Sequence, residues 1–67
     1  EVIHMNIIKS EHKVDLELIR IEHNLLNDGY FYTLTHRPTF KRTFTSGLYP
    51  TDIDARTAAF KHVGVQS

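Results

Sequence analysis

The chain has 67 residues, of which 40% are hydrophobic and 24% charged, with equal numbers of acidic and basic side chains. This length and composition indicate one small globular domain and argue against a disordered segment. The absence of cysteine excludes a disulfide framework and a thiolate metal site, and it favours a cytoplasmic location.

The N-terminal ten residues lack the basic segment and the long apolar run of a signal peptide. No apolar run approaches the ~20 residues of a membrane-spanning helix, so we expect no membrane partner. The chain begins with Glu1, and its one methionine is Met5. Two origins therefore stay open for residues 1–4: an internal start within a longer protein, or vector-derived residues ahead of Met5. In either case we expect residues 1–67 to form a single domain.

The charge is unevenly distributed. Residues 1–28 carry six acids and three bases, whereas residues 29–67 carry five bases and two acids. The second half is therefore the better candidate for contact with an acidic partner or a nucleic acid, although a dedicated nucleic-acid binder usually has a basic excess over the whole domain.

The first 26 residues predict one strand and one ambiguous element. Residues 2–8 are short, β-branched and apolar, as in a strand, and residues 9–13 form a polar break. Residues 14–26 fit two patterns. As a strand, Val14, Leu16 and Leu18 share one face. A bulge after Leu18 would absorb the change of phase, so that Ile19 and Ile21 continue the apolar row. As a helix, apolar residues recur at spacings of four, three and four. We favour the strand narrowly and leave both alternatives open.

Asn27-Asp28-Gly29 predicts a turn, because asparagine and glycine adopt positive φ easily. A β-hairpin over residues 30–46 follows, with its loop at Arg37-Pro38-Thr39. The expected register pairs His36 with Phe40, Leu34 with Arg42, Tyr32 with Phe44 and Tyr30 with Ser46. It gathers five apolar side chains on the core face: Tyr30, Tyr32, Leu34, Phe40 and Phe44. Arg42 then shares the core face, at an edge or stacked on an aromatic ring.

The C-terminal part predicts a helix over about residues 52–63. Thr51 is a suitable N-cap, Asp52 and Asp54 suit the first turn, and Gly64 suits the end. The apolar side of this helix consists of Ile53, Ala55, Ala59, Phe60 and Val63. The fold class is therefore α+β: a small antiparallel sheet of three or four strands backed by a C-terminal helix.

The aromatic strand followed by S-G-L-Y-P-T-D-x-D-A-x-x-A-A, within residues 29–63, carries a resemblance to two groups of small sheet-plus-helix modules. One group is the arm-type and AP2-type DNA-binding domains, in which a three-stranded sheet backed by a helix enters the major groove. The other is the YegP-like family of small uncharacterised bacterial proteins. The first resemblance implies DNA binding through the sheet.

The outer face of the hairpin is the candidate binding surface. Its expected members are Phe31, Thr33, Thr35, Lys41 and Thr43, with Arg37 on the rim and Arg42 and Tyr49 nearby. Cations, hydroxyl groups and an aromatic ring can hold a phosphate backbone. The simpler interpretation is a solvated sheet face, on which threonine is common and lysine prevents edge pairing. Phe31 and Tyr49 are the aromatic residues that we expect to be exposed, where they would suit a protein partner.

Enzyme chemistry has little support in the sequence. The five histidines are scattered, and no pair has the helical spacing of a zinc site. No serine lies in a nucleophile motif, and the acid pairs Asp15/Glu17 and Asp52/Asp54 have structural explanations. We expect no catalytic residues, metal, cofactor or small-molecule substrate. The sequence therefore predicts a non-enzymatic module that binds a protein partner or itself, with nucleic-acid binding as the alternative.

Overall fold

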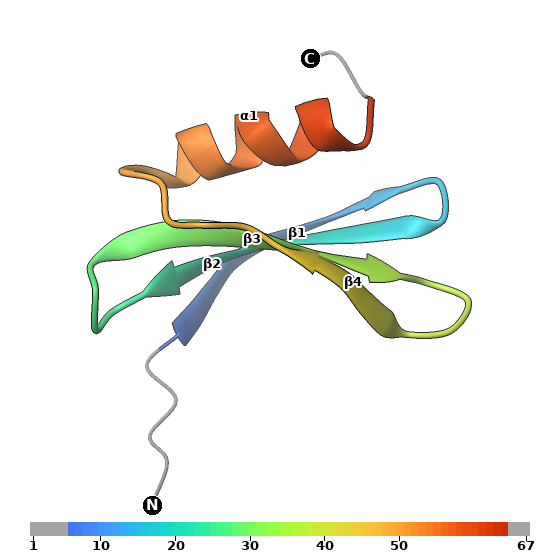
Figure 1. The fold of residues 1–67 in the computed structure, drawn as a ribbon, viewed down its shortest axis with the longest axis horizontal. Coiled ribbons are helices and arrows are strands. Elements are labelled where there is room, and N and C mark those ends of the chain that lie inside the picture. The colour runs from blue at the N-terminus through green and yellow to red at the C-terminus, as the bar shows by residue number, and fades with distance from the viewer. Residues whose placement is uncertain (1–5, 65–67) are drawn as a thin grey trace, which may run out of the picture.

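The computed structural model describes residues 6–64, which form an antiparallel four-stranded sheet covered on one face by a helix (Figure 1). The elements are β1 (Asn6–Val14), β2 (Glu17–Asn24), β3 (Gly29–His36), β4 (Lys41–Thr45) and α1 (Asp52–His62). The strands lie in the order β1-β2-β3-β4, so each pairs with its neighbour in sequence. The predicted α+β class is confirmed, and the sheet has the larger of the two expected strand numbers.

β1 extends to Val14, beyond the end predicted at residue 8. The expected strand began at residue 2, and residues 2–5 lie outside the described part of the chain. The polar break predicted at residues 9–13 is wrong, because these residues lie inside β1. Ser10, His12 and Val14 are half-buried and alternate with exposed side chains, which is the pattern of a strand with one solvated face. A bulge between Ile8 and Ser10 interrupts the ladder with β2.

The ambiguous segment is a strand, so the narrowly favoured alternative is right. β2 covers Glu17–Asn24, and a tight turn at Asp15-Leu16 separates it from β1. The bulge predicted after Leu18 is absent from the ladder with β3, which is regular throughout. The phase slip in the sequence arises because Leu18 lies on the face away from the helix and Ile19 on the core face, while Val14 belongs to the preceding strand. Asp15 makes the turn with φ 53°, a left-handed conformation that aspartate tolerates better than most residues.

The β3–β4 hairpin forms, but its predicted register is wrong. The structure pairs His36 with Lys41, Thr35 with Arg42, Leu34 with Phe44 and Thr33 with Thr45. The loop is longer than expected because residues 37–40 all lie in the turn, and Phe40 adopts φ 55° there. The register then shifts again between Leu34 and Thr35, where Thr43 is the extra residue. These two irregularities move Arg42 to the face with Thr35 and leave Phe44 on the face of Leu34.

Residues 46–50 lead from β4 to the helix along the start of β3. The backbone groups of Tyr30 and Tyr49 exchange two hydrogen bonds, with N–O distances of 2.9 and 2.6 Å. Gly29 allows this close approach, because a Cβ added there would lie 3.0 Å from Cβ of Leu48. The turn predicted at Asn27-Asp28-Gly29 is confirmed, with Asp28 at φ 51°.

The helix has the predicted position and cap. Thr51 has extended backbone angles, and its hydroxyl oxygen accepts a hydrogen bond of 3.1 Å from the amide of Asp54. Gly64 follows the helix with φ 83°, as expected of a residue just past the end. One part of the predicted apolar side is wrong: Ile53 is 61% exposed. It lies in the first turn, away from the alanines that touch the sheet.

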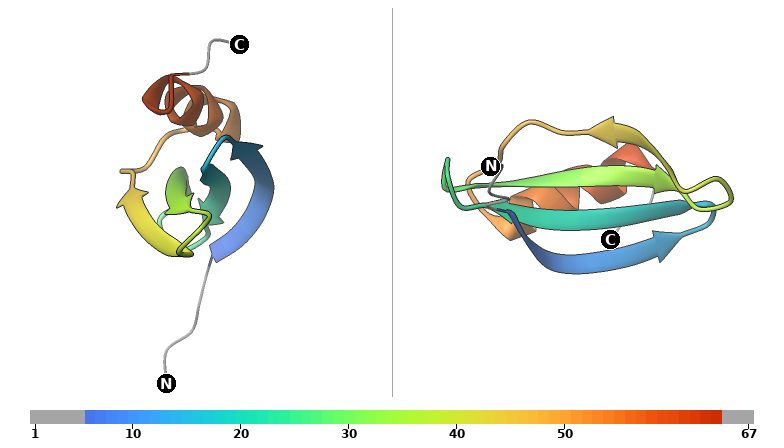
Figure 2. Two further views of the ribbon diagram at one scale, coloured as in Figure 1. Left: turned by 90° about the vertical axis from the view of Figure 1, so that its right-hand side faces the viewer. Right: turned by 90° about the horizontal axis from the view of Figure 1, so that it is seen from below.

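The core lies between α1 and the two central strands. Its fully buried side chains come from β2, β3 and one stripe of the helix: Ile19, Ile21, Tyr32, Leu34, Ala55 and Ala59. The two alanines are completely buried, so the helix packs closely against the sheet. The sheet is twisted, and the left view of Figure 2 shows its edge strands β1 and β4 each running from a start far from the helix to an end nearer to it.

Candidate functional site: the hairpin-end patch

The structure divides the predicted binding face instead of gathering it. Strand alternation places Phe31, Thr33 and Thr35 on the outer face of the sheet, away from the helix, and Arg42 joins them through its pairing with Thr35. Lys41 pairs with His36 and therefore lies on the opposite face.

The remaining predicted residues have local structural roles. The Thr43 hydroxyl donates a hydrogen bond of 3.3 Å to the carbonyl of Leu34 across the bulge. Tyr49 packs on the helix side of the sheet, where its ring stacks 6.3 Å from that of Tyr32. The expected surface is thus not continuous, because the true register alternates differently from the predicted one.

Two further expectations about exposure need correction. Phe31 and Thr33 are both buried, with 9% and 1% of their surfaces exposed. Both lie on β3, which has a neighbouring strand on each side. Tyr49 is only half-exposed. Phe31 and Thr33 are therefore poorly placed to meet a partner.

The two turns at one end of the sheet are joined to each other. The amide of Arg37 donates to the carbonyl of Leu16 at 2.8 Å, and its guanidinium donates to the carbonyl of Asp15 at 2.6 Å. The β1–β2 turn and the β3–β4 turn are therefore held side by side. Arg37, predicted as a rim cation for a ligand, serves first as the link between these turns.

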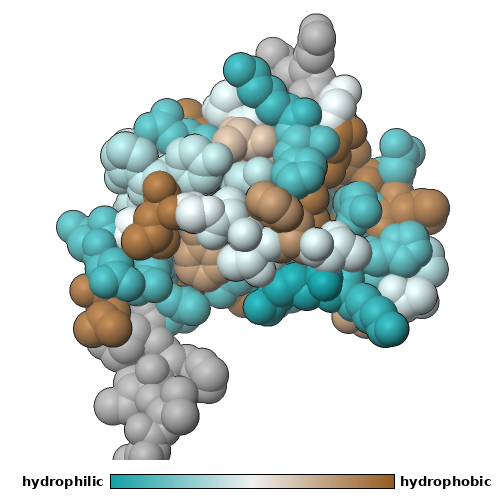
Figure 3. Space-filling model, in the orientation of Figure 1, coloured by the Kyte–Doolittle hydropathy of each residue, from teal (hydrophilic) through white to brown (hydrophobic). Residues whose placement is uncertain are grey.

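An apolar surface covers this end of the molecule, and we call it the hairpin-end patch. It surrounds a shallow pocket of about 450 Å³ and consists of Leu16, Leu18, Pro38 and Phe40, with Lys13 and Arg37 at its border. Figure 3 shows apolar atoms at the end of the molecule that carries the two turns, among hydrophilic side chains. An exposed apolar surface with a polar rim is typical of an interaction site.

Phe40 is the unusual member of this patch. Its side chain is 84% exposed, and its backbone lies in the left-handed region at φ 55°. That conformation costs a residue with a bulky side chain about 1 kcal/mol, and glycine or asparagine would adopt it more easily. Neither burial nor backbone preference explains a phenylalanine here. A strained residue that folding does not require points to a function.

An aromatic cluster lies on the helix side of the sheet, under the C-terminal end of α1. The Tyr32 hydroxyl and Nδ1 of His62 are 2.9 Å apart, and the Phe44 and His62 rings meet edge-on with centroids 4.5 Å apart. Burial raises the pKa of Tyr32 above the usual value, and the nearby Tyr49 adds to this shift. The cluster ties the helix to β3 and β4.

Two further histidines lie in separate packing contacts. His12 meets Phe60 edge-on and His23 stacks on Tyr30, with centroids 5.2 and 4.2 Å apart. Among residues 6–64, no three His, Asp or Glu side chains come together as a metal site would need. In the same part of the chain, no helix is long and apolar enough to cross a membrane.

Comparison with known proteins adds no relative: no family model, no curated protein and no solved structure matches this chain. The candidate site therefore depends on its geometry.

Sequence reasoning missed Leu16, Leu18 and Phe40. The predicted register pairs Phe40 with His36 in the second hairpin strand, and the pattern of residues 14–26 puts both leucines inside one element. Recognising the turn at Asp15-Leu16 would have separated the two strands. That turn contains neither glycine nor proline, so the sequence gives little sign of it.

Proposed function

We propose that this protein is a non-enzymatic binding module that associates with a second copy of itself through the hairpin-end patch. The observation that supports it best is Phe40, an exposed aromatic side chain of that patch held on a strained backbone. Exposed aromatic residues are frequent anchors of protein interfaces. The lack of cysteine suits a reducing compartment, and we place the module in the cytoplasm.

The second copy is preferred as partner because the two ends of the sheet are complementary. The hairpin-end patch has Lys13 and Arg37 at its border, so two such patches facing each other would bring like charges together. The opposite end carries the β2–β3 turn, which exposes Leu26 to 77% and has Asp28 beside it. Figure 1 shows these turns at opposite ends of the sheet. An apolar group flanked by an acid fits an apolar patch flanked by cations.

The resulting contact is head-to-tail. One copy presents the Phe40 end and the next presents the Leu26 end, so each copy keeps one unused end. Such heterologous contacts form rings or open chains and not closed twofold dimers.

Sedimentation velocity over a range of concentrations tests this proposal. The wild-type protein should associate as its concentration rises, and Phe40→Asn should reduce that association strongly. Ile53→Asn is a matched control, because Ile53 is also an exposed apolar residue but lies in α1. A monomeric wild-type protein, or a Phe40→Asn variant that associates as well as the wild type, would overturn the proposal. A monomer would turn the search to a different protein partner.

Nucleic-acid binding through the outer face is the second candidate, and one observation favours it. The ladders align Lys13, Leu18, Thr35 and Arg42 in one row across the outer face. Arg20 lies in the next row, although it forms an ion pair of 2.8 Å with Glu11. The resemblance to arm-type and AP2-type domains, which present a sheet to DNA, supports the same candidate.

Fluorescence anisotropy with mixed-sequence DNA distinguishes the two candidates. Binding through phosphate contacts should weaken by orders of magnitude between about 50 and about 200 mM salt. Arg42→Glu should then abolish it, whereas Arg56→Glu on the exposed side of α1 should not. Binding that ignores salt, or no binding at low salt, would exclude the nucleic-acid candidate.

A further inference from the structure

A second pocket lies under the C-terminal end of α1, on the opposite side of the sheet from the outer face. It has a volume of about 510 Å³, within the range of small-ligand sites. Its apolar walls are Val14, Leu34, Phe44 and Val63, which come from three strands and the end of the helix. We call it the Glu17 pocket, after the acid that enters it.

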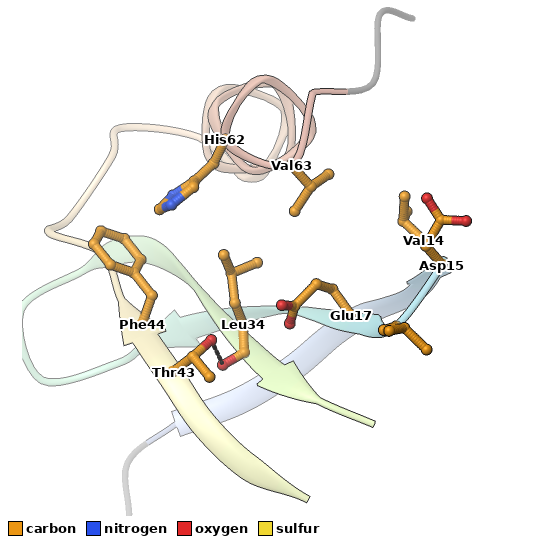
Figure 4. Close-up of a pocket in the computed structure, with 9 residues that line it drawn as sticks. Val14, Asp15, Glu17, Leu34, Thr43, Phe44, His62 and Val63 are labelled. Atoms are coloured by element: carbon orange, nitrogen blue, oxygen red, sulfur yellow. Dashed lines mark hydrogen bonds between the residues drawn. The ribbon is translucent and has the colours of Figure 1, made fainter. Parts of the chain in front are cut away.

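The carboxylate of Glu17 is the feature that needs explanation. Its Oε2 atom is buried and has no hydrogen-bond partner among the described residues. Figure 4 shows the Glu17 side chain extending from β2 toward Leu34, with Val63 and His62 above it. A carboxylate oxygen shielded from water without a partner is unfavourable, and such atoms commonly mark a place where another group binds.

The surrounding groups favour a cation as that partner. Asp15 also lines the pocket, whereas the described lining contains neither lysine nor arginine. In the ladder His36 lies beside Glu17 and Lys41 lies beyond it, but neither supplies a partner for Oε2. The C-terminal end of α1 carries the negative end of the helix dipole and reaches the pocket at His62 and Val63.

The rest of the lining specifies the shape of the cation. The apolar walls, including Phe44, suit an aliphatic chain that carries its charge at one end. His62 is held in place by the contact of its Nδ1 with the Tyr32 hydroxyl, so the helix side of the pocket is firmly positioned. A hydrated metal ion would not use these walls, whereas an alkylammonium group would.

We propose that the Glu17 pocket binds a primary ammonium group on an aliphatic chain, with the charge at Glu17 and the chain against Leu34, Phe44 and Val63. A free amine and a lysine side chain carry this same chemistry. The site is separate from the hairpin-end patch and does not depend on the self-association proposed above.

Titration with n-pentylammonium, followed by the backbone amide signals in NMR spectra, tests this inference. We expect saturable shifts centred on Glu17, Leu34 and Val63. The neutral analogue n-pentanol should bind at least about tenfold more weakly, because it lacks the charge-assisted hydrogen bond. Nα-acetyl-lysine methylamide identifies the source: tighter binding than n-pentylammonium indicates a lysine side chain, and weaker binding indicates a free amine.

Variants show whether Glu17 is responsible. Glu17→Gln should weaken n-pentylammonium binding at least about tenfold, whereas Glu22→Gln should leave it unchanged. Glu22 lies on the same strand and pairs with Phe31 on the outer face, so it is a matched control. Val63→Phe fills the pocket while keeping Glu17 and should also abolish binding, which keeps the test valid if Glu17→Gln folds poorly. Equal binding of n-pentanol, unchanged binding in Glu17→Gln, or no saturable shift in the wild type would overturn the inference.

Discussion

The hydroxyl of Tyr32, at the centre of β3, lies 2.9 Å from Nδ1 of His62 in the last turn of α1. This contact joins the helix to the sheet at one border of the core, where Tyr32 is itself buried. The burial of Tyr32 also makes the stability of the fold depend on pH. Burial, with a smaller contribution from Tyr49, raises the pKa of the Tyr32 phenol, so the folded state keeps this proton at a pH where the unfolded chain has lost it.

The sign of the pH effect follows from this difference in protons. Above the usual tyrosine pKa of about 10, the unfolded state binds fewer protons than the folded state, so stability falls as pH rises. We expect Tyr32→Phe to lower the unfolding free energy at pH 8 by about 1 kcal/mol and to make the alkaline loss shallower. Urea unfolding at several pH values from 8 to 11 measures both. Tyr49→Phe should also make the loss shallower, and a Tyr32→Phe variant with an unchanged slope would contradict the assignment.

The N-cap at Thr51 should be measurable in stability. Its hydroxyl oxygen accepts the amide proton of Asp54, so Thr51→Ala should lower the unfolding free energy by about 1 kcal/mol. Thr51→Ser keeps an oxygen that can accept the same hydrogen bond and should retain most of the stability. Chemical denaturation of the two variants makes the comparison, and equal losses would show that the cap is not the cause.

The close packing of α1 on the sheet depends on Ala59, which is completely buried. Ala59→Leu should lower stability by roughly 1–3 kcal/mol, because the larger side chain has no space between the helix and the strands. Thr57→Leu introduces the same side chain at an exposed helix position and should be neutral or slightly stabilising. Thermal unfolding followed by circular dichroism distinguishes them. A tolerated Ala59→Leu would mean that the helix is less closely packed than described.

Phe40 should oppose folding slightly. Since its backbone is left-handed and its side chain is 84% exposed, Phe40→Asn should raise the unfolding free energy by up to about 1 kcal/mol. Phe40→Leu keeps the strained backbone with a branched apolar side chain and should give no such gain. Urea denaturation of dilute protein, below the range of self-association, provides the measurement. A less stable Phe40→Asn variant would assign Phe40 a role in folding.

Local chemistry predicted the helix and one turn well. Thr51, the acids of the first turn and Gly64 mark the helix ends directly, and Asn27-Asp28-Gly29 marks the β2–β3 turn. These signals are short-range, since each depends on a few neighbouring backbone groups. Together with the alternation in residues 30–46 they predicted the α+β class, whereas residues 14–26 stayed open between strand and helix.

The register of the β3–β4 hairpin and the residues of the hairpin-end patch could not be predicted from such local signals. Phe40 was expected in a strand because alternation counts every residue, but the turn takes four residues and Thr43 is extra in the ladder. Each irregularity moves the side chains that follow to the other face. The hairpin-end patch also needs two turns that lie far apart in sequence, which Arg37 joins only in the folded protein. The Glu17 pocket likewise combines all four strands with the end of the helix.

The most direct test of the central claim is sedimentation of Phe40→Asn mixed with Leu26→Asn. Each variant alone lacks one of the two contact surfaces and should remain monomeric at concentrations where the wild type associates. In an equimolar mixture, the intact Phe40 end of the Leu26→Asn chain can bind the intact Leu26 end of the Phe40→Asn chain. We expect the mixture to form a dimer and to grow no further. A mixture that stays monomeric, or single variants that associate like the wild type, would contradict the head-to-tail contact.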